Sequence, residues 1–317
     1  MVRRVLVIGA CGFIGRAVVA AFRRHGIAVT AIDLAADRGA LGDDIELIAG
    51  SVTDRVALSE AIKRVEPHAI VSLAAFSRPS TGLAISAEAD RDAAFAVNVD
   101  GLRNVVESAL EHDVPRIVWS SSTVALGRAA GEISATVDEC AIARPCNIYG
   151  LTKAMAEQIS TYAHDVMGMD IAALRPTLVL GPRHPYSGVL DPLKRLFAHR
   201  PEDGPVELSW GSQAFDIVHV EDVAAAFLRL CLRPEPLSAI YHVNGGATRI
   251  GEIVDVVTHL RPGLDVRLSR AEAETLYPLV SSERMAAETG FVPRFSPSDI
   301  VVDCVRQANG PNGGANV

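Results

Sequence analysis

Short runs of apolar residues alternate with helical periodicity over the first 176 residues of the chain. Most of these runs are rich in β-branched residues, which is typical of strands buried on both faces of a parallel sheet. The runs occupy residues 5–8, 28–32, 46–49, 69–73, 116–119 and 171–176, and the longest helical patterns cover 13–24, 90–111 and 149–167. Strands that alternate with helices predict an α/β fold built on a doubly wound parallel sheet.

The pattern loosens after Gly181-Pro182, and proline and glycine recur as far as Pro205. Beyond this point we expect helices at 189–198, 221–232 and 250–260, and strands at 217–220 and 239–243. The pattern therefore predicts a main domain over residues 1–176 and a smaller α/β region over residues 177–308, some of whose segments return to the first sheet. The polar, glycine-rich residues 309–317 are expected to be a disordered tail.

Charge and cysteine content narrow the classes of partner. The 317 residues carry 30 basic and 38 acidic side chains, a net charge of −8, without a basic run that would bind nucleic acid or an anionic membrane. No apolar run reaches the roughly 18 residues of a membrane span, and the apolar residues 5–8 are expected to be a strand rather than a signal peptide. The five cysteines are scattered without metal-ligand spacing, so we expect no metal site and a cytoplasmic location.

A glycine-rich turn separates the first strand from the first helix. Gly9, Gly12 and Gly15 recur every third residue, a spacing that differs by one residue from the usual dinucleotide-binding fingerprint. Glycines let a backbone approach a pyrophosphate, and the helix N-terminus attracts its charge. Asp33 ends the second strand, where an acid accepts hydrogen bonds from the ribose of NAD and repels the 2′-phosphate of NADP. We therefore expect NAD as cofactor, although Arg38 makes that preference less strict and Asp33 has a loop-capping role as its alternative.

Tyr149 and Lys153 open a long helical pattern four residues apart. Positions i and i+4 lie on one face of a helix, so the phenol and the ammonium can serve one site. A free tyrosine has a pKa of about 10, and a nearby cation lowers that pKa by favouring the phenolate. The pair is able to exchange a proton with an alcohol or a carbonyl near neutral pH. The spacing also arises by chance, as a half-buried tyrosine beside a solvated lysine.

Other polar residues stand at the ends of predicted strands. Ser120-Ser121-Ser122-Thr123 follows the fifth strand, at the edge where parallel sheets bind ligands. Residues 77–84 form a polar, turn-rich stretch, whose default interpretation is a surface loop. Asn98 falls on the apolar face of the 90–111 helix, where an asparagine needs partners, either as a structural hydrogen-bonding group or as part of the active site.

Together the motifs resemble the extended short-chain dehydrogenase/reductases, also called the NAD-dependent epimerase/dehydratase family. The resemblance covers the chain to about residue 305 and implies a Rossmann-like NAD-binding domain followed by a substrate-binding region. The motifs that carry it are Gly9-x-x-Gly12-x-x-Gly15, Asp33, Leu73-Ala74-Ala75, Asn98-Val99-x-Gly101-x-x-Asn104, Ser120-Ser121-Ser122, Tyr149-x-x-x-Lys153, Leu174-Arg175-Pro176, Gly181-Pro182, His219-Val220-Glu221-Asp222-Val223 and Tyr241-x-Val243-x-Gly245-Gly246.

The resemblance assigns roles by position. Ser122 is expected to hold the substrate oxygen, Tyr149 to exchange the proton, and Lys153 to bind the nicotinamide ribose and lower the pKa of Tyr149. The residues expected to bind NAD are Gly9, Gly12, Phe13, Ile14, Gly15, Asp33, Ser51, Val52, Leu73, Ala74, Ala75, Asn98, Ser120, Tyr149, Lys153 and Pro176. The residues expected to contact a small-molecule substrate are Phe76, Ser122, Thr123, Asn147, Thr177 and Arg183.

Departures from the family pattern bear on the substrate. Members that act on nucleotide sugars usually carry an asparagine where this chain has Thr177 and a phosphate-clamping arginine where it has Phe215. Loss of a guanidinium removes a strong charge-assisted contact, for which Arg183, His184 or Arg195 are the possible substitutes. Ser51 stands where the family often has the aspartate that reads the adenine amino group. Val124-Ala125 replaces the Asp-Glu pair of the dehydratases, so dehydration is not expected.

Two enzymatic activities agree with these residues, and a third possibility is a regulator. A dehydrogenase would oxidise a secondary alcohol of a small sugar, sugar acid, polyol or hydroxy acid and release NADH. A nucleotide-sugar 4-epimerase would use the same residues and regenerate NAD in place. A non-catalytic NAD-binding regulator is disfavoured because Tyr149 and Lys153 are both present. Family members commonly form homodimers through two long helices, here near residues 90–111 and 149–167.

Overall fold

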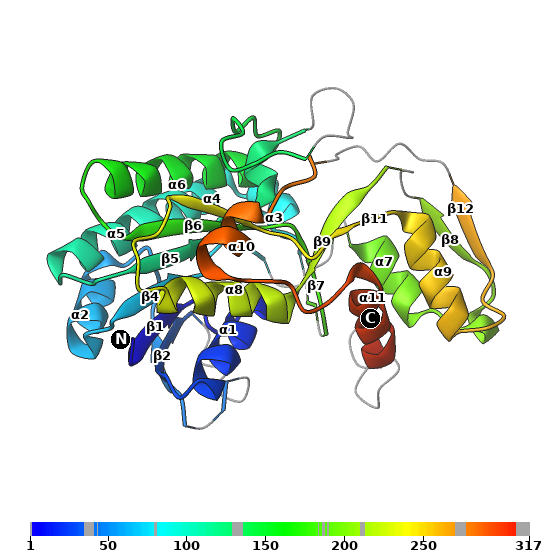
Figure 1. Cartoon of the computed structure of the whole chain (residues 1–317), viewed down its shortest axis with the longest axis horizontal. Helices are drawn as coiled ribbons and strands as arrows, with labels where there is room; N and C mark the ends of the chain where they lie inside the picture. Colours follow the sequence, from blue (N-terminus) through cyan, green and yellow to red (C-terminus); the bar gives the residue numbers. More distant parts are fainter. Residues whose placement is uncertain are drawn as a thin grey trace.

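The computed structural model describes residues 2–34, 41–42, 44–78, 81–128, 136–182, 184–185, 188, 190–209, 213–269 and 277–308. A seven-stranded sheet, paired in parallel throughout and ordered β10-β6-β5-β4-β1-β2-β3, forms its centre (Figure 1). The strands are β1 Arg4–Ile8, β2 Ala28–Asp33, β3 Glu46–Ala49, β4 Ala69–Ser72, β5 Ile117–Ser120, β6 Ile171–Pro176 and β10 Ile240–Val243. The prediction of an α/β fold on a doubly wound parallel sheet is confirmed.

Helices cover both faces of this sheet. Alternate residues of β1 point to opposite faces, so Val5 and Val7 join one apolar core while Leu6 and Ile8 join the other. The first core is closed by α1 Phe13–Arg24 and α8 Val220–Leu232. The second core is closed by α2 Arg55–Val65, α5 Gly101–Glu111 and α6 Ile148–Asp165.

The C-terminal residues build a smaller region at one end of the sheet (Figure 1, right). It contains a three-stranded sheet, ordered β11-β9-β7, and a parallel pair of β8 and β12. Its elements are β7 Leu178–Leu180, α7 Asp191–Ala198, β8 Val206–Ser209, β9 Phe215–His219, β11 Ala247–Thr248, α9 Ile250–Leu260, β12 Val266–Ser269 and α11 Pro297–Ala308. A third apolar core lies between these elements, whereas β10 and the short helix α10 Glu283–Thr289 pack against the main sheet region.

Three stretches differ from the sequence prediction. The helix expected at 90–111 is divided into α4 Arg91–Phe95, a π-helical turn Ala96–Asp100 and α5. The polar stretch 77–84 leads into a short helix, α3 Leu83–Ala89, rather than ending as a loop. The helix expected from residue 189 begins at Asp191. The expected tail, 309–317, lies outside the described residues.

Candidate active site

The glycine turn brings the backbone close to the end of β4. Gly9 has a φ of +79°, and a Cβ there would lie 3.0 Å from the Ala74 nitrogen. A Cβ on Gly15 would lie 2.2 Å from the Gly9 carbonyl oxygen, so only glycine fits. Gly12 stands at the N-cap of α1 and offers no capping side chain to the amides that open this helix. Since such amides attract a pyrophosphate, the turn fits the diphosphate of NAD.

Asp33 lies beside this turn, at the end of β2. Its Oδ2 accepts a hydrogen bond of 2.8 Å from the Cys11 backbone nitrogen, which orients the carboxylate at the turn where a ribose is expected. Val52 is buried and packs beside Gly101, where a Cβ would lie 2.5 Å from the Val52 Cγ2. The Ser51 hydroxyl pairs with the Thr53 hydroxyl at 2.7 Å. Asp33, Ser51 and Val52 therefore lie at or just after the carboxyl ends of the neighbouring strands β2 and β3, which is where the NAD prediction expects them.

Tyr149 and Lys153 lie on the buried face of α6. Only 6% of Tyr149 and 2% of Lys153 is exposed, so Lys153 is not the solvated lysine of a chance pairing. The Lys153 Nζ donates to the Ser120 carbonyl oxygen at 2.7 Å and lies 5.8 Å from the centre of the Tyr149 ring. Burial lowers the pKa of Lys153 to about 8, although the Glu157 carboxylate acts to raise it. A buried ammonium beside a phenol is the arrangement that favours a phenolate.

The serine run at the end of β5 divides into different environments. The Ser121 hydroxyl donates to the Glu157 Oε1 at 2.5 Å, and the Thr123 hydroxyl donates to the Pro176 carbonyl oxygen at 3.3 Å. Ser122 is partly exposed, and its oxygen accepts from the Val124 nitrogen at 3.2 Å. Because Ser122 retains its hydroxyl proton as a donor, it is better suited than Thr123 to hold a substrate oxygen.

Asn98 connects the loop after β4 to α6. It lies in the π-helical turn with 3% of its surface exposed. Its Oδ1 accepts from the Phe76 nitrogen at 2.8 Å, and its Nδ2 donates to the Thr152 hydroxyl at 2.9 Å. The Thr152 hydroxyl in turn donates to the Tyr149 carbonyl oxygen. Of the two roles left open by the sequence, these contacts support the structural one, which fixes the position of Tyr149.

The residues expected to contact substrate have different surroundings. The Asn147 side chain caps α6, accepting from the Gly150 nitrogen at 2.8 Å and donating to the Tyr277 hydroxyl at 3.3 Å, so its substrate contact stays a prediction. Thr177 is 7% exposed, and no hydrogen-bond partner for its hydroxyl lies among the described residues. Arg183 lies outside the described residues. Sequence reasoning missed Tyr277, because no motif marks a residue 130 positions away from Asn147 in the chain.

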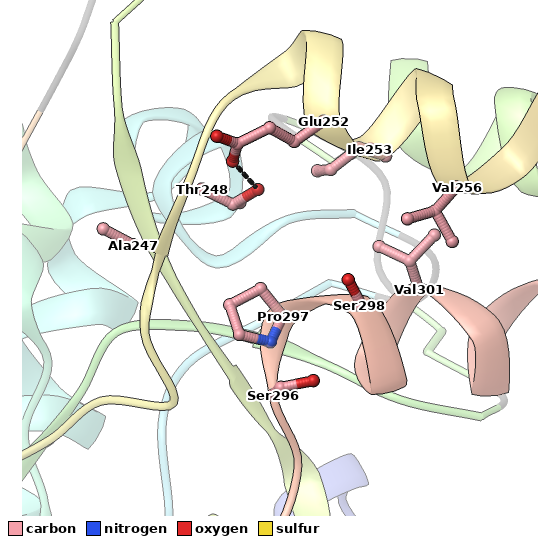
Figure 2. Close-up of a pocket in the computed structure, with 9 residues that line it drawn as sticks. All are labelled: Ala247, Thr248, Glu252, Ile253, Val256, Ser296, Pro297, Ser298 and Val301. Carbon is pink, nitrogen blue, oxygen red and sulfur yellow. Dashed lines mark hydrogen bonds between the residues drawn. The ribbon is translucent and has the colours of Figure 1, made fainter.

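A hollow of about 270 Å³ lies between α9 and α11, apart from this site (Figure 2). None of the predicted site residues lines it. Three of its polar side chains have protein partners, since the Glu252 Oε2 accepts from the Thr248 hydroxyl and the Arg249 nitrogen, and the Ser296 hydroxyl donates to Asp299. Within the described residues, no helix has the length and apolar character needed to cross a membrane. No group of metal-ligating side chains was found among the same residues.

The glycine turn lies at the junction of β1 and α1, and the buried tyrosine–lysine pair lies on α6 near the carboxyl end of β5. Together they define an NAD-binding enzyme of the α/β class. The chain belongs to the NAD-dependent epimerase/dehydratase family, whose model matches residues 5–244. The resemblance inferred from the motifs and the assignment of NAD as cofactor are thereby confirmed.

Relatives with different activities match the chain. It is 30% identical over 303 residues to sterol demethylase protein B of Methylococcus capsulatus, covering 92% of this chain and 84% of that protein. It is 31% identical over 179 residues to the mitochondrial L-threonine 3-dehydrogenase of Sus scrofa, covering 55% of this chain and 47% of that protein. The UDP-glucose 4-epimerase of Halalkalibacterium halodurans is 23% identical over 320 residues, covering 94% of this chain and 93% of that protein.

Solved structures show the same fold. L-threonine dehydrogenase from Clostridium difficile superposes with a TM-score of 0.85 at 20% identity, over 96% of this chain and 97% of that one. UDP-glucose 4-epimerase from Thermus thermophilus, in complex with NAD, has a TM-score of 0.80 at 24% identity, over 97% and 99% of the two chains. The fold is therefore shared by dehydrogenases and epimerases and does not distinguish them.

Proposed function

We propose that this enzyme is an NAD-dependent dehydrogenase that oxidises a secondary alcohol of a small sugar, sugar acid, polyol or hydroxy acid. The observation that carries this proposal is Phe215, which stands where nucleotide-sugar enzymes usually have a phosphate-clamping arginine. Phe215 is 8% exposed and belongs to the apolar core of the C-terminal region. The adjacent Asp216 is also buried, and its carboxylate accepts from the Val280 nitrogen at 2.7 Å. Neither residue offers a cation to a diphosphate, so a substrate without one suits this position better.

The residues of the site divide the chemistry among them. NAD, when bound, accepts a hydride from the substrate carbon. The glycine turn and Asp33 would hold the cofactor, and the Ser122 hydroxyl would donate a hydrogen bond to the substrate oxygen. Tyr149 would take the hydroxyl proton at its phenolate oxygen, with the Lys153 ammonium stabilising that negative charge. Asn98 and Thr152 would keep Tyr149 in place.

One comparison favours the alternative, a nucleotide-sugar 4-epimerase. The UDP-glucose 4-epimerase of H. halodurans matches 94% of this chain, whereas the L-threonine 3-dehydrogenase of S. scrofa matches 55%. In this alternative Tyr149 would move the same proton, and another cation would replace the missing clamp. His184, whose ring centre lies 4.8 Å from that of Phe13 on the cofactor turn, and Arg195 on α7 are the candidates within the described residues.

An NADH assay distinguishes the two activities. Purified protein and NAD would be mixed separately with free sugars, sugar acids, polyols, hydroxy acids and nucleotide sugars, and each product would be separated by chromatography. NADH accumulation on an alcohol without a nucleotide is the expected result. A converted nucleotide sugar without net NADH would overturn the dehydrogenase and establish the epimerase. In either case we expect Tyr149→Phe to lower kcat by about 10²–10⁴-fold, because it removes the acid/base.

We also propose that the enzyme is a homodimer in the cytoplasm. None of the five cysteines, all of them among the described residues, forms a disulfide, which agrees with a reducing compartment. The support for the dimer is a stripe of exposed apolar side chains on α6, among them Leu151, Met155 and Tyr162.

A further inference from the structure

A buried ion pair lies directly beneath the candidate active site. Glu157 and Arg175 are each 2% exposed. The Arg175 Nε donates to the Glu157 Oε1 and its second terminal nitrogen to the Oε2, both at 2.7 Å. The Ser121 hydroxyl donates to the same carboxylate at 2.5 Å. Glu157 therefore accepts three hydrogen bonds, as a buried charge requires.

This pair touches each element that supplies the catalytic groups. Glu157 follows Lys153 by four residues on α6, so Tyr149, Lys153 and Glu157 lie along one face of the helix. Ser121 directly precedes Ser122 at the end of β5. Arg175 lies in β6, two residues before Thr177. The pair thus joins α6 to the ends of β5 and β6.

Both charged and neutral groups of the described residues surround the Lys153 ammonium. Tyr149 and Glu157 face it from its own helix and Arg175 lies beyond Glu157 on β6, while β5 contributes the neutral Trp119 ring and the Ser120 carbonyl oxygen. Arg175 also donates to the Nε2 of His242, at 3.2 Å. Burial and the Arg175 charge lower the pKa of His242 to about 3, so this histidine is neutral. The Glu157 carboxylate thus acts on Lys153 to raise its pKa, and Arg175 lies bonded to both oxygens of that carboxylate.

We infer that Glu157 and Arg175 form a positioning pair, which holds the Ser122 turn against α6 through Ser121 and balances the charge beside Lys153. This inference rests on the proposed roles of Ser122, Tyr149 and Lys153. Glu157 stabilises the ammonium of Lys153, and Arg175 limits that effect. Neither residue of the pair touches the substrate.

The ionisation of Lys153 can be measured without a substrate. The chain contains three lysines, Lys63, Lys153 and Lys194, so protein labelled with carbon-13 at lysine Cε gives three resolvable signals. Variants Lys63→Arg and Lys194→Arg assign them by elimination. The Lys153 midpoint is then followed across pH by NMR, and circular dichroism shows that each variant is folded. Because no turnover is needed, a failure of this inference is distinct from a failure of the dehydrogenase assignment.

Opposite substitutions should move the Lys153 midpoint in opposite directions. Glu157→Gln keeps the side-chain shape, removes the negative charge and should lower the midpoint by about 1 pH unit. Arg175→Gln leaves the carboxylate unopposed and should raise it. A purely structural pair would give shifts of the same sign or none, and that result would overturn the inference. If neither single variant folds, the double variant Glu157→Gln/Arg175→Gln replaces them. It should still lower the Lys153 midpoint, because Glu157 is the charge that raises the pKa of Lys153. An unchanged Lys153 midpoint in the double variant would overturn the inference.

The positioning of Ser122 has its own test. Ser121→Ala keeps the ion pair but removes the hydroxyl that ties the turn to Glu157. We expect kcat on the substrate found by the NADH assay to fall by about tenfold, with the Lys153 midpoint and the KM for NAD unchanged. Ser121→Thr, which retains a hydroxyl, should restore kcat. An unchanged kcat in Ser121→Ala would show that the Ser121 hydroxyl does not position Ser122.

Discussion

At the scale of single residues, the catalytic proposal depends on a lysine that is buried rather than solvated. Burial lowers the pKa of Lys153 to about 8, so its ammonium is present below that pH and is lost above it. As the ammonium is lost, the pKa of Tyr149 should return towards that of a free tyrosine and the phenolate should become less available. We expect the rate of alcohol oxidation to stop rising with pH near 8 and then to fall. A pH profile of kcat/KM tests this, and a rate that continues to rise to pH 10 would contradict it.

A second residue, Asp216, should make stability depend on pH. Burial raises its pKa from 3.8 to about 6, although hydrogen bonds from Val280 and Asn244 act to lower it. Folding therefore favours the protonated carboxyl, and stability attributable to Asp216 decreases as the pH rises from about 4 to 6. Above pH 6 the ionised group destabilises the fold by up to about 3 kcal/mol, the equivalent of this pKa difference.

Asp216→Asn removes that dependence on pH. We expect the variant to be more stable than the wild type at pH 7 and the difference to shrink as the pH falls towards 4, as measured by urea unfolding. Asp255→Asn, at an exposed position of α9, is the matched control. A difference in unfolding free energy that stays constant over this pH range would show that Asp216 does not titrate as described.

Individual site residues were predictable from sequence only where a motif fixed their place. The glycine turn, Tyr149 and Lys153 follow from local spacing, so the structure finds them where they were expected. The choice between Ser122 and Thr123 depends on a long-range contact, because the Thr123 hydroxyl donates to the carbonyl oxygen of Pro176, 53 residues away in the chain. The roles of Asn98 and Tyr277 likewise depend on partners 54 and 130 residues away. Sequence spacing carries no information on such contacts.

At the scale of elements, continuous apolar runs and long helical periods were predicted, and short segments with neither were not. The strands of the main sheet are continuous apolar runs and were found within about two residues of their ends. Strands β7 and β11 have only three and two residues, and β8 and β12 alternate apolar and polar residues over only four positions, too few for a period to be recognised. The π-helical turn at 96–100 was missed because it leaves the apolar pattern of the 90–111 helix continuous. It also carries Asn98, which agrees with the tendency of π-bulges to occur at functional sites.

The junction of β1 and α1 provides a test at this scale. In Gly15→Ala the new Cβ would lie 2.2 Å from the Gly9 oxygen and 2.6 Å from the Ala10 oxygen, and both are backbone atoms that cannot move aside alone. We expect the turn to open, with NAD affinity falling by at least about tenfold and a loss of about 1–3 kcal/mol in unfolding free energy. Fluorescence titration with NADH and urea unfolding measure the two effects.

Gly251→Ala is the matched control for this substitution. Gly251 lies inside α9, and no neighbouring atom lies within 4 Å of the Cβ that alanine would add. Alanine is preferred over glycine in helices and Gly251 stands in the first turn of α9, so this variant should gain up to about 0.5 kcal/mol and bind NADH normally. If Gly15→Ala bound NADH as tightly as Gly251→Ala, the glycine turn would not be the pyrophosphate site.

At the scale of the whole molecule, one large sheet places the candidate site at the carboxyl ends of its strands, and the C-terminal region lies next to it (Figure 1). The residues expected to bind NAD lie mainly at or just after the ends of β1 to β5, as is usual for doubly wound sheets. The departures from the nucleotide-sugar pattern, Thr177 and Phe215, lie in segments after β6. The cofactor was predictable because its motifs are local in sequence, whereas the expected substrate residues come from segments far apart in the chain, so the substrate was not.

An apolar stripe on α6 supports the proposed homodimer. Its exposed side chains are Leu151, Met155, Tyr162 and Val166, with exposed fractions of 37%, 40%, 59% and 65%. Their spacing of four, seven and four residues puts them on one face of the helix, opposite the face that carries Lys153 and Glu157. A continuous apolar face on a helix at the surface is typical of an interface between subunits. We therefore expect α6 of one subunit to pack against the same region of its partner.

Charges introduced into this stripe should separate the subunits. Tyr162→Lys/Val166→Lys puts two ammonium groups at the proposed interface, and the two-fold arrangement of a homodimer doubles that number. Sedimentation equilibrium should then give a dimer for the wild type and a monomer for the variant. Val56→Lys, at a site on α2 that is 70% exposed, adds a similar charge outside the stripe and should remain dimeric. If the wild type sediments as a monomer, or if the double variant remains a dimer, the stripe on α6 is not the subunit interface.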